Sequence, residues 1–387
     1  MKRFSSEQRY SAYYAVLFGS IGAMMPFAAL WMNHLGIEPA MIGLIVAAPS
    51  VAMLFTTVAL GRWADSLADR RLAIIVGNWV ILCAHLVLFV FASQWVVMLV
   101  WLVAGICMYA KVPITDAAAL SLARRNGSDF ARVRMFGSIG FMLALTLAGY
   151  IYEFYGVGVF ITVALVANLS RLMVAYALPK NQRVQAKSAD DTPANSPSDT
   201  GLYKKAILLT LVGGALINAS HSVINTYAIL LWTQQGISES TASQAIALGV
   251  AVEVALMWWF RSLTRNVSAR ACLLVAAACG LLRWSLLADQ TSVAVIFAAQ
   301  ALHGITFGVS FLACASFISR RVPEESAARG QSLLATITTG CMAVATFSCG
   351  QLFDSLGSSL YWGMAGLCLL ATAAVAASYR FPLSDSK

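Results

Sequence analysis

The sequence is short of charge. Charged residues make up 11% of its 387 positions, whereas hydrophobic residues make up 59%. Soluble proteins carry about 25% charged residues, so this chain lacks the polar surface that a water-soluble fold needs. The sequence also lacks a phosphate-binding G-x4-G-K-[ST] motif and a Cys/His metal-ligand spacing, which excludes a nucleotide-driven pump and a zinc site. Its eight cysteines all lie within apolar segments, where single thiols behave as small apolar side chains, and we expect no disulfide.

Long apolar runs fill most of the chain. Runs such as Ala206–Leu231 and Ala271–Ala288 reach the roughly 20 residues of a membrane-spanning helix, and most lack the polar stripe of an amphipathic helix. The sequence therefore predicts an all-α integral membrane protein with twelve transmembrane helices. The predicted spans are 10–32, 40–60, 72–92, 95–120, 134–153, 157–178, 204–232, 240–260, 271–288, 293–318, 332–353 and 359–379.

One polar stretch, Pro179–Tyr203, interrupts this pattern halfway along the chain. It is rich in Ser, Asp, Asn and Pro, and such a composition buries too little apolar area to fold. We therefore predict a six-helix bundle in residues 1–178, a cytoplasmic linker at 179–203, and a second six-helix bundle in residues 204–387.

The basic residues predict the orientation in the membrane. Of the 26 Lys and Arg residues, 23 lie in the two tails and in alternate loops, which all fall on one side of a twelve-span topology. The opposite loops contain no Lys or Arg and carry Glu38, Glu239, Asp289 and Asp354. Because cytoplasmic loops are enriched in Lys and Arg, both termini are predicted to be cytoplasmic.

A few ionisable residues lie inside the spans, where a charge costs several kcal/mol and usually marks a functional site. They are Lys111, Asp116, Glu253, Arg283 and His303, with Arg134 at the start of the fifth span. The alternative is that they form ion pairs that only hold helices together.

Other polar and aromatic residues in the spans are weaker candidates. His221 and Asn225 are one turn apart and could share a cavity face, whereas His85 is expected to pack and Arg171 to extend toward the lipid headgroups. Three aromatic residues could stack on a substrate or anchor the spans at the interface: Tyr109, Trp258 and Trp284.

The cytoplasmic loop after the second span reads GRWADSLADRR, from Gly61 to Arg71. A tight turn needs small residues, and Asp65 could cap a helix or accept hydrogen bonds from an arginine of the same loop. The loop resembles the signature of the major facilitator superfamily, G-x-L-A-D-R-x-G-R-[RK]-[RK]. The matching residues are Gly61, Ala64, Asp65, Arg70 and Arg71, and the departures are Trp63, Ser66, Ala68 and Asp69.

Within that superfamily the chain resembles the bacterial 3-phenylpropionate permease group, which is related to lactose permease-type proton symporters. The resemblance rests on six short segments: PITDA (113–117), VRMFGSIGF (133–141), GVAVEV (249–254), SAR (268–270), RW (283–284) and ALHGITF (301–307). It implies two pseudo-symmetric bundles and proton-coupled uptake by alternating access.

The resemblance to lactose permease also implies roles for the charged residues. Asp116 and Arg134 match its sugar-holding acid and arginine, while Glu253, Arg283 and His303 match its proton-coupling group. Thr306 departs from the pattern, because lactose permease has a proton-carrying glutamate there. Either Glu253 or Asp116 would then carry the proton, with Arg283 pairing alternately with the deprotonated acid.

These observations predict a bacterial inner-membrane transporter rather than an enzyme. The candidate substrate-binding residues are Asp116, Arg134, Tyr109, Asn225 and His221. An aromatic acid such as 3-phenylpropionate fits as the imported solute, a sugar or nucleoside fits almost as well, and sugar or drug efflux by the same fold is a third possibility. We expect a monomer that binds a small molecule, protons and the lipid bilayer, uses the proton gradient as its energy source, and needs no cofactor, metal or nucleic acid.

Overall fold

The computed structural model describes residues 5–67, 69–180, 204–288, 292–322 and 327–381. The described residues are almost entirely helical, and they divide into two compact units, Met1–Thr192 and Pro193–Lys387. The predicted linker lies outside the described residues, apart from its first two positions, and so does Asp289.

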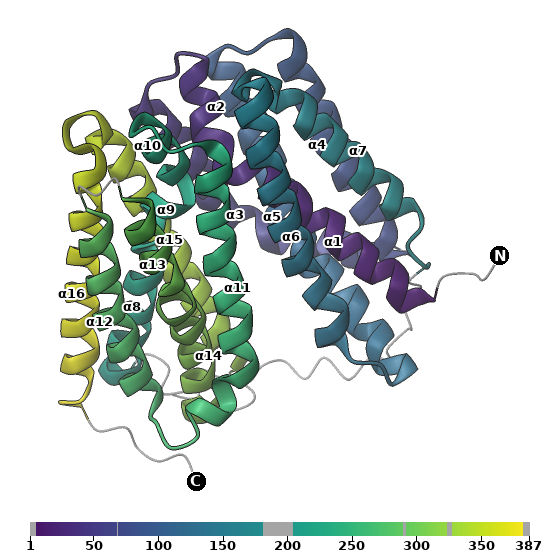
Figure 1. Ribbon diagram of the computed structural model, residues 1–387. Helices are drawn as coiled ribbons and strands as arrows, with labels where there is room; N and C mark the ends of the chain where they lie inside the picture. The colour runs from purple at the N-terminus through teal and green to yellow at the C-terminus, as the bar shows by residue number, and fades with distance from the viewer. Residues whose placement is uncertain (1–4, 68, 181–203, 289–291, 323–326, 382–387) are drawn as a thin grey trace. The chain divides into compact units, whose positions relative to one another are not determined.

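Unit 1 contains the helices drawn in purple to teal in Figure 1. Their bounds are α1 (Ser6–Met24), η1 (Met25–Phe27), α2 (Ala28–His34), α3 (Pro39–Ser66), α4 (Arg70–Val90), α5 (Gln94–Asn126), α6 (Phe130–Tyr155), η2 (Val157–Val159) and α7 (Phe160–Tyr176).

Unit 2 contains the green to yellow helices of Figure 1. Their bounds are α8 (Lys205–Ala219), α9 (Ser222–Thr226), α10 (Ala228–Gln234), α11 (Glu239–Leu263), α12 (Ala269–Leu287), α13 (Val293–Ala301), η3 (Gly304–Val309), α14 (Ser310–Arg321), α15 (Ala327–Leu356), η5 (Gly357–Ser359) and α16 (Leu360–Ser378).

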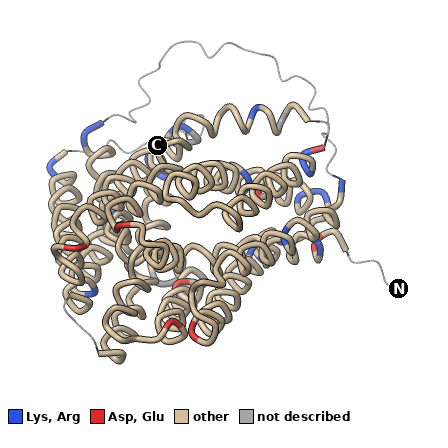
Figure 2. The backbone as a smooth tube through the Cα atoms, turned by 90° about the horizontal axis from the view of Figure 1, so that it is seen from above, with Lys and Arg blue, Asp and Glu red and all other residues tan. Residues whose placement is uncertain are grey.

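The helices have the length and composition of membrane spans. Among the described residues, 11 helical stretches are long and apolar enough to cross a membrane. The last, Arg329–Ser378, has 50 residues and contains α16 and all but the first two residues of α15. Figure 2 shows how sparsely charged residues are placed along the helices. Large aromatic side chains such as Phe55 and Trp258 are 80% and 78% exposed, which suits contact with lipid better than contact with water.

Side-chain caps and glycine fix the helix ends. Ser5 and Gln8 form a capping box at the start of α1, so two free N–H groups find partners. The Asp129 carboxylate accepts from the Ala131 N–H at 2.9 Å and begins α6. Gly127 ends α5 with a φ of 65°, a left-handed conformation that glycine adopts without steric cost.

Small residues allow the closest helix contacts in unit 1, as is common in membrane bundles. A Cβ atom at Gly140 would overlap the Ala15 carbonyl, so α1 and α6 cross with their backbones in contact. Between α3 and α5, a Cβ at Gly105 would lie 2.5 Å from the Pro49 Cβ. Gly140 belongs to the VRMFGSIGF segment, which therefore has a packing role in addition to presenting Arg134.

Candidate functional site

Unit 2 holds a cluster of buried polar side chains around Arg283 of α12. Its Nη1 donates to the Thr306 hydroxyl at 2.8 Å and lies 3.1 Å from both His221 Nε2 and His303 Nδ1. Its Nη2 donates to Gln300 Oε1. Arg283 is fully buried, so these partners replace the water that a guanidinium would otherwise bind. We call these five residues together with Glu253 the Arg283 cluster.

The partners of the two histidines assign their protons. His221 Nδ1 lies 3.0 Å from the Ile217 carbonyl and donates to it. Its Nε2 accepts from the Thr306 hydroxyl, 3.1 Å away, because the two Nη1 protons of Arg283 go to Thr306 and His303. His303 Nδ1 faces an Arg283 N–H and must accept, so its proton is on Nε2, 3.3 Å from Glu253 Oε2. Because arginine stays charged in proteins, a neutral imidazole connects the Glu253 carboxylate to the Arg283 guanidinium.

Glycines and a change of helix type bring Glu253 to His303. The chain passes from α13 into a π-helix, η3, directly after His303, and such π segments often occur at functional sites. A Cβ at Gly304 would lie 2.7 Å from Leu256 Cδ1 and 3.0 Å from the backbone of Glu253, and one at Gly308 would lie 3.1 Å from Glu253 Cγ. Only the absence of side chains there lets α11 approach η3 this closely.

The remaining candidates in unit 2 differ in burial, because Trp284 and His221 are buried whereas Asn225 and Trp258 are exposed. Trp284 is buried, lies 4.4 Å from the Arg283 guanidinium and donates to the Ser220 hydroxyl at 3.0 Å. His221 is buried in the cluster, but Asn225 is exposed and forms no side-chain bond with it in the described structure. The two residues lie one helical turn apart, because the Asn225 N–H donates to the His221 carbonyl at 2.9 Å, and their shared cavity face stays a prediction. Trp258 is 78% exposed and lines a separate hollow together with Arg265 and Arg320.

In unit 1, Asp116 of α5 and Arg134 of α6 lie together, as the resemblance implied. Arg134 Nε is 3.5 Å from Asp116 Oδ1, which also accepts from the Tyr14 hydroxyl at 2.6 Å. The Arg134 guanidinium lies 4.0 Å from the centre of the Phe18 ring, a cation–π geometry. A Cβ at Gly137 would be 2.8 Å from the Phe18 ring, so this glycine makes room for the stack. Asp116 and Arg134 are both about one-third exposed, which leaves them accessible to a solute.

Lys111 and Tyr109 are neighbours on α5 with different surroundings. Lys111 is 2% exposed, and its ammonium donates to Asn78 Oδ1 at 2.6 Å, while Asn78 Nδ2 donates to the Tyr13 hydroxyl at 3.1 Å. Tyr109 is 38% exposed and its hydroxyl lies 3.2 Å from that of Ser50. Lys111 is thus held inside the bundle by neutral groups, whereas Tyr109 is only partly covered.

The expectation that Arg171 reaches the lipid headgroups is wrong. Arg171 is fully buried, and it donates to the Ser20 hydroxyl and to Asn168 Oδ1, both at 2.8 Å. The Arg171 guanidinium is bound by acceptors of α1 and α7 inside the bundle, whereas it was expected to extend outward to the lipid headgroups. His85 packs as expected, buried with Nδ1 at 2.8 Å from the Ile81 carbonyl.

The signature loop is shorter than predicted because α3 continues through Ser66. Gly61 and Asp65 therefore lie on the last turns of α3, and the side chain of Asp65 is outside the described residues. The cap of α4 is Asp69, whose Oδ1 accepts from the Arg71 N–H at 3.0 Å and whose Oδ2 is 3.4 Å from Arg71 Nε. Arg70 is the first residue of α4.

Several residues of these clusters were not predicted. They are uncharged, and single polar residues in an apolar run do not stand out by charge: Gln300, Tyr14, Asn78 and Asn168. Gln300 lies one turn before His303, however, and this helical spacing could have placed it on the same face.

The described residues form helices of membrane-spanning length that enclose buried charged clusters. These features are those of a multi-pass membrane transporter. The chain belongs to the MFS_1 like family, whose model matches residues 8–377. It is accordingly a transporter of the major facilitator type and not an enzyme.

Individual relatives agree with this class. The chain is 26% identical, over 92% of its length and 94% of the relative's, to the "Probable 3-phenylpropionic acid transporter" of Escherichia coli (strain K12). Among solved structures, its fold is similar to the nucleoside transporter NupG, with a TM-score of 0.82 at 14% identity, covering 98% of this chain and all of the other. The D-xylose-proton symporter matches with a TM-score of 0.72 at 13% identity, covering 98% of both chains.

Proposed function

We propose that this transporter is a proton symporter that imports 3-phenylpropionate or a related aromatic acid by alternating access. The proposal places it as a monomer in a bacterial inner membrane with both termini in the cytoplasm, and it requires a proton gradient but no cofactor. The substrate class is that of the Escherichia coli relative, the "Probable 3-phenylpropionic acid transporter". The orientation follows from the one-sided distribution of Lys and Arg.

The observation that carries proton coupling is the Glu253–His303–Arg283 chain. Glu253 lies 3.3 Å from His303 Nε2, and His303 Nδ1 lies 3.1 Å from Arg283 Nη1. When Glu253 is ionised, its charge attracts the imidazole N–H and, through the ring, the guanidinium. When Glu253 is protonated, this attraction is lost and Arg283 keeps only neutral partners. Uptake of one proton thus weakens the connection of α11 to η3 and α12, which would permit these helices to move.

The Glu253–His303–Arg283 contacts differ from the direct acid–arginine pair that the sequence suggested, because the His303 imidazole lies between the acid and the arginine. Thr306, at the position where a glutamate was missing, accepts from Arg283 at 2.8 Å and contributes no proton site. Glu253 is then the proton carrier, and Asp116, which is paired with Arg134 and Tyr14, is the alternative carrier.

Substituting Glu253→Gln tests the proposal in inverted and right-side-out vesicles with an imposed pH gradient. We expect gradient-driven accumulation of 3-phenylpropionate to fall at least about tenfold, since loss of a charged hydrogen bond is worth about 1.5–3 kcal/mol. Exchange of labelled for unlabelled substrate should continue, because exchange needs no net proton movement. Glu239→Gln, on the same helix, is the matched control and should behave as the unaltered protein. Unchanged gradient dependence in Glu253→Gln would remove Glu253 as the carrier.

A second candidate function, proton symport of a sugar or nucleoside, is favoured by the polar, one-third-exposed Asp116 and Arg134. Such a pair can bind hydroxyl groups, and the same fold occurs in a nucleoside transporter and a xylose symporter. Lactose and uridine should therefore be tested beside 3-phenylpropionate and cinnamate. Accumulation of lactose or uridine but not of the two aromatic acids would favour this candidate. An internal concentration of the compound below the external one would favour efflux.

A further inference from the structure

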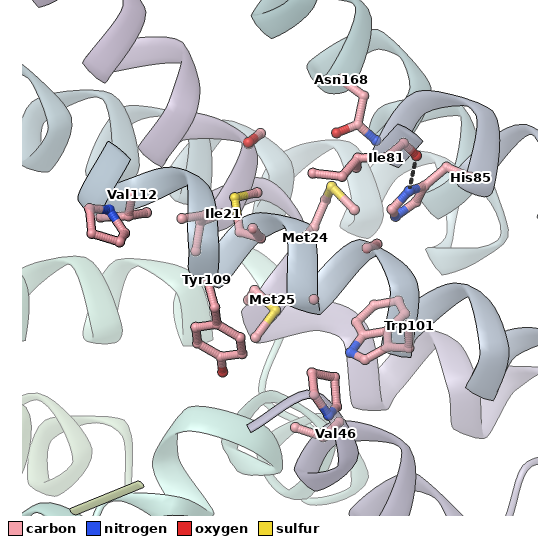
Figure 3. Close-up of a pocket in the computed structure, with 16 residues that line it drawn as sticks. Ile21, Met24, Met25, Val46, Ile81, His85, Trp101, Tyr109, Val112 and Asn168 are labelled. Atoms are coloured by element: carbon pink, nitrogen blue, oxygen red, sulfur yellow. Dashed lines mark hydrogen bonds between the residues drawn. The ribbon is translucent and has the colours of Figure 1, made fainter. Parts of the chain in front are cut away.

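Unit 1 contains a cavity of about 350 Å³ that lies among α1, α3, α4, α5 and α7. This volume falls within the roughly 300–1,000 Å³ of small-molecule pockets. Most of its wall is apolar or aromatic, and its large side chains include Met24, Met25, Met108, Trp101 and Tyr109. Figure 3 shows the Trp101 and Tyr109 rings and two of the methionines around this space. Methionine side chains adapt their shape to a bound group, so the wall suits a planar apolar ligand.

Two buried polar groups stand out in this apolar wall. Asn168 and His85, both labelled in Figure 3, are 0% and 2% exposed. Within the described residues, Asn168 Nδ2 and His85 Nε2 have no hydrogen-bond partner. Buried polar atoms are nearly always paired. The unpaired Asn168 N–H groups in the lining of a cavity therefore indicate a site that an acceptor group of a ligand completes.

A buried positive charge lies behind the same side of the cavity. The side-chain partners of Arg171 are Ser20 and Asn168, at 2.8 Å, and the Met108 sulfur, at 3.8 Å, and all three line the cavity. No carboxylate pairs with Arg171 in the described part of the chain, and its Nε has no hydrogen-bond partner there. A buried cation without a counter-charge is costly, and the missing charge can come from an anionic ligand.

We propose that this cavity is the binding site for an arylalkyl monocarboxylate, with its carboxylate at Asn168 and its ring against Trp101 and the methionines. Asn168 is already oriented, because its oxygen accepts from Arg171 and its N–H groups remain for the carboxylate. A small shift of the flexible Met108 side chain would open Arg171 to the ligand. The inference rests on the proposed function and names where in the chain its substrate binds.

The chemistry of the cavity disfavours the other substrate classes. A sugar carries several hydroxyl groups that this mostly apolar wall would leave unpaired, and unpaired polar groups weaken binding strongly. An organic cation would be repelled by Arg171, and also by Lys111, whose ammonium is held by the neutral Asn78. One negative charge joined to one apolar ring matches the Asn168 donor and the apolar wall.

The first experiment measures the preference for charge. Binding of 3-phenylpropionate and of its neutral analogue 3-phenylpropanol to the purified full chain is measured by titration calorimetry. We expect the acid to bind at least about tenfold more tightly, because bonds to a charged group are the stronger ones, and Arg171→Gln to abolish this preference. If the preference instead disappears in Arg134→Gln or Arg283→Gln and survives in Arg171→Gln, the carboxylate binds elsewhere and the inference is overturned.

The second experiment locates the ligand and does not depend on Arg171 variants folding. A diazirine derivative of 3-phenylpropionate is photo-crosslinked to the unaltered protein, and the labelled peptides are identified by mass spectrometry. We expect labelling of α1 and α5 that excess 3-phenylpropionate prevents. Ala104→Phe, which fills the cavity, should remove this labelling, whereas Leu99→Phe, at a position of α5 that is 61% exposed, should not.

The outcomes separate the two proposals. Saturable binding of 3-phenylpropionate with labelling confined to α8–α16 would overturn the cavity site and leave the proposed function standing. Labelling of α1 and α5 that a saturated fatty acid prevents equally well, without the acid-over-alcohol preference, would identify a lipid site and overturn the inference. Absence of any binding of 3-phenylpropionate would remove both the proposed substrate and its site.

Discussion

The contact between α11 and η3 gives a prediction whose size follows from the structure. In Gly304→Ala, the new methyl group would lie 3.0 Å from the Glu253 Cα and 2.7 Å from Leu256 Cδ1. Carbon atoms pack best about 3.5–4.0 Å apart, so α11 must move away by roughly 0.5 Å or more. Leu256 can rotate, but the Glu253 backbone can yield only if the helix moves.

This movement acts directly on the proposed coupling group. Glu253 Oε2 is 3.3 Å from His303 Nε2, already near the limit of a hydrogen bond, and a shift of that size would break the contact. A hydrogen bond to a charged group contributes about 1.5–3 kcal/mol. We therefore expect Gly304→Ala to reduce accumulation driven by a pH gradient by about tenfold or more, although no ionisable residue has been changed.

The assay compares two kinds of transport in proteoliposomes. Accumulation under an imposed pH gradient should fall, while exchange of substrate at equal pH should be retained. Gly340→Ala is the matched control, because a Cβ there meets no atom within 4 Å, and it should transport normally. If Gly304→Ala accumulated substrate as the unaltered protein does, the close approach of α11 and η3 would have no part in coupling.

Two further predictions concern unit 1. Gly140→Ala should lower the thermal unfolding temperature in detergent, since its methyl would overlap the Ala15 carbonyl and overpacking costs about 1–3 kcal/mol. Gly366→Ala is the control, because a Cβ there meets open space, and its unfolding temperature should not change. Equal unfolding temperatures of the two variants would contradict the α1–α6 contact. Tyr14→Phe removes the 2.6 Å hydrogen bond to Asp116 and should leave the pH profile of uptake unchanged, because Glu253 carries the proton in our proposal. A shifted profile would move that role to Asp116.

The positions of the spans could be predicted from the sequence, because the hydropathy of the segments and the charge of the loops are independent signals that agree. The predicted spans 134–153 and 359–379 correspond to α6 and to α16 within a few residues at each end. Helix ends were less predictable where polar residues continue a helix. The signature loop was expected to begin at Gly61, but α3 extends through Ser66 and the cap is Asp69.

The sites were predictable only where charge marks them. Glu253, Arg283 and His303 do meet, but the sequence could not show that the imidazole lies between the acid and the arginine. Arg171 was misjudged because depth along a helix does not reveal which way a side chain faces. His221 and Asn225 do lie one helical turn apart, as their spacing predicted, but His221 is buried in the Arg283 cluster whereas Asn225 is exposed.

The π-helix η3 makes the Arg283 cluster depend on chain length. A π segment holds one residue more than α-helical winding would use, so deleting one residue from Gly304–Val309 would restore ordinary winding and remain invisible to hydropathy. The residues on either side would keep their directions, because the π segment absorbs the extra residue, but the wide turn that brings Gly304 and Gly308 against Glu253 would be lost. The number of residues in η3 therefore matters as much as their chemistry: a chain that kept every polar residue of the Arg283 cluster but lost one residue of η3 would lose the close approach of α11.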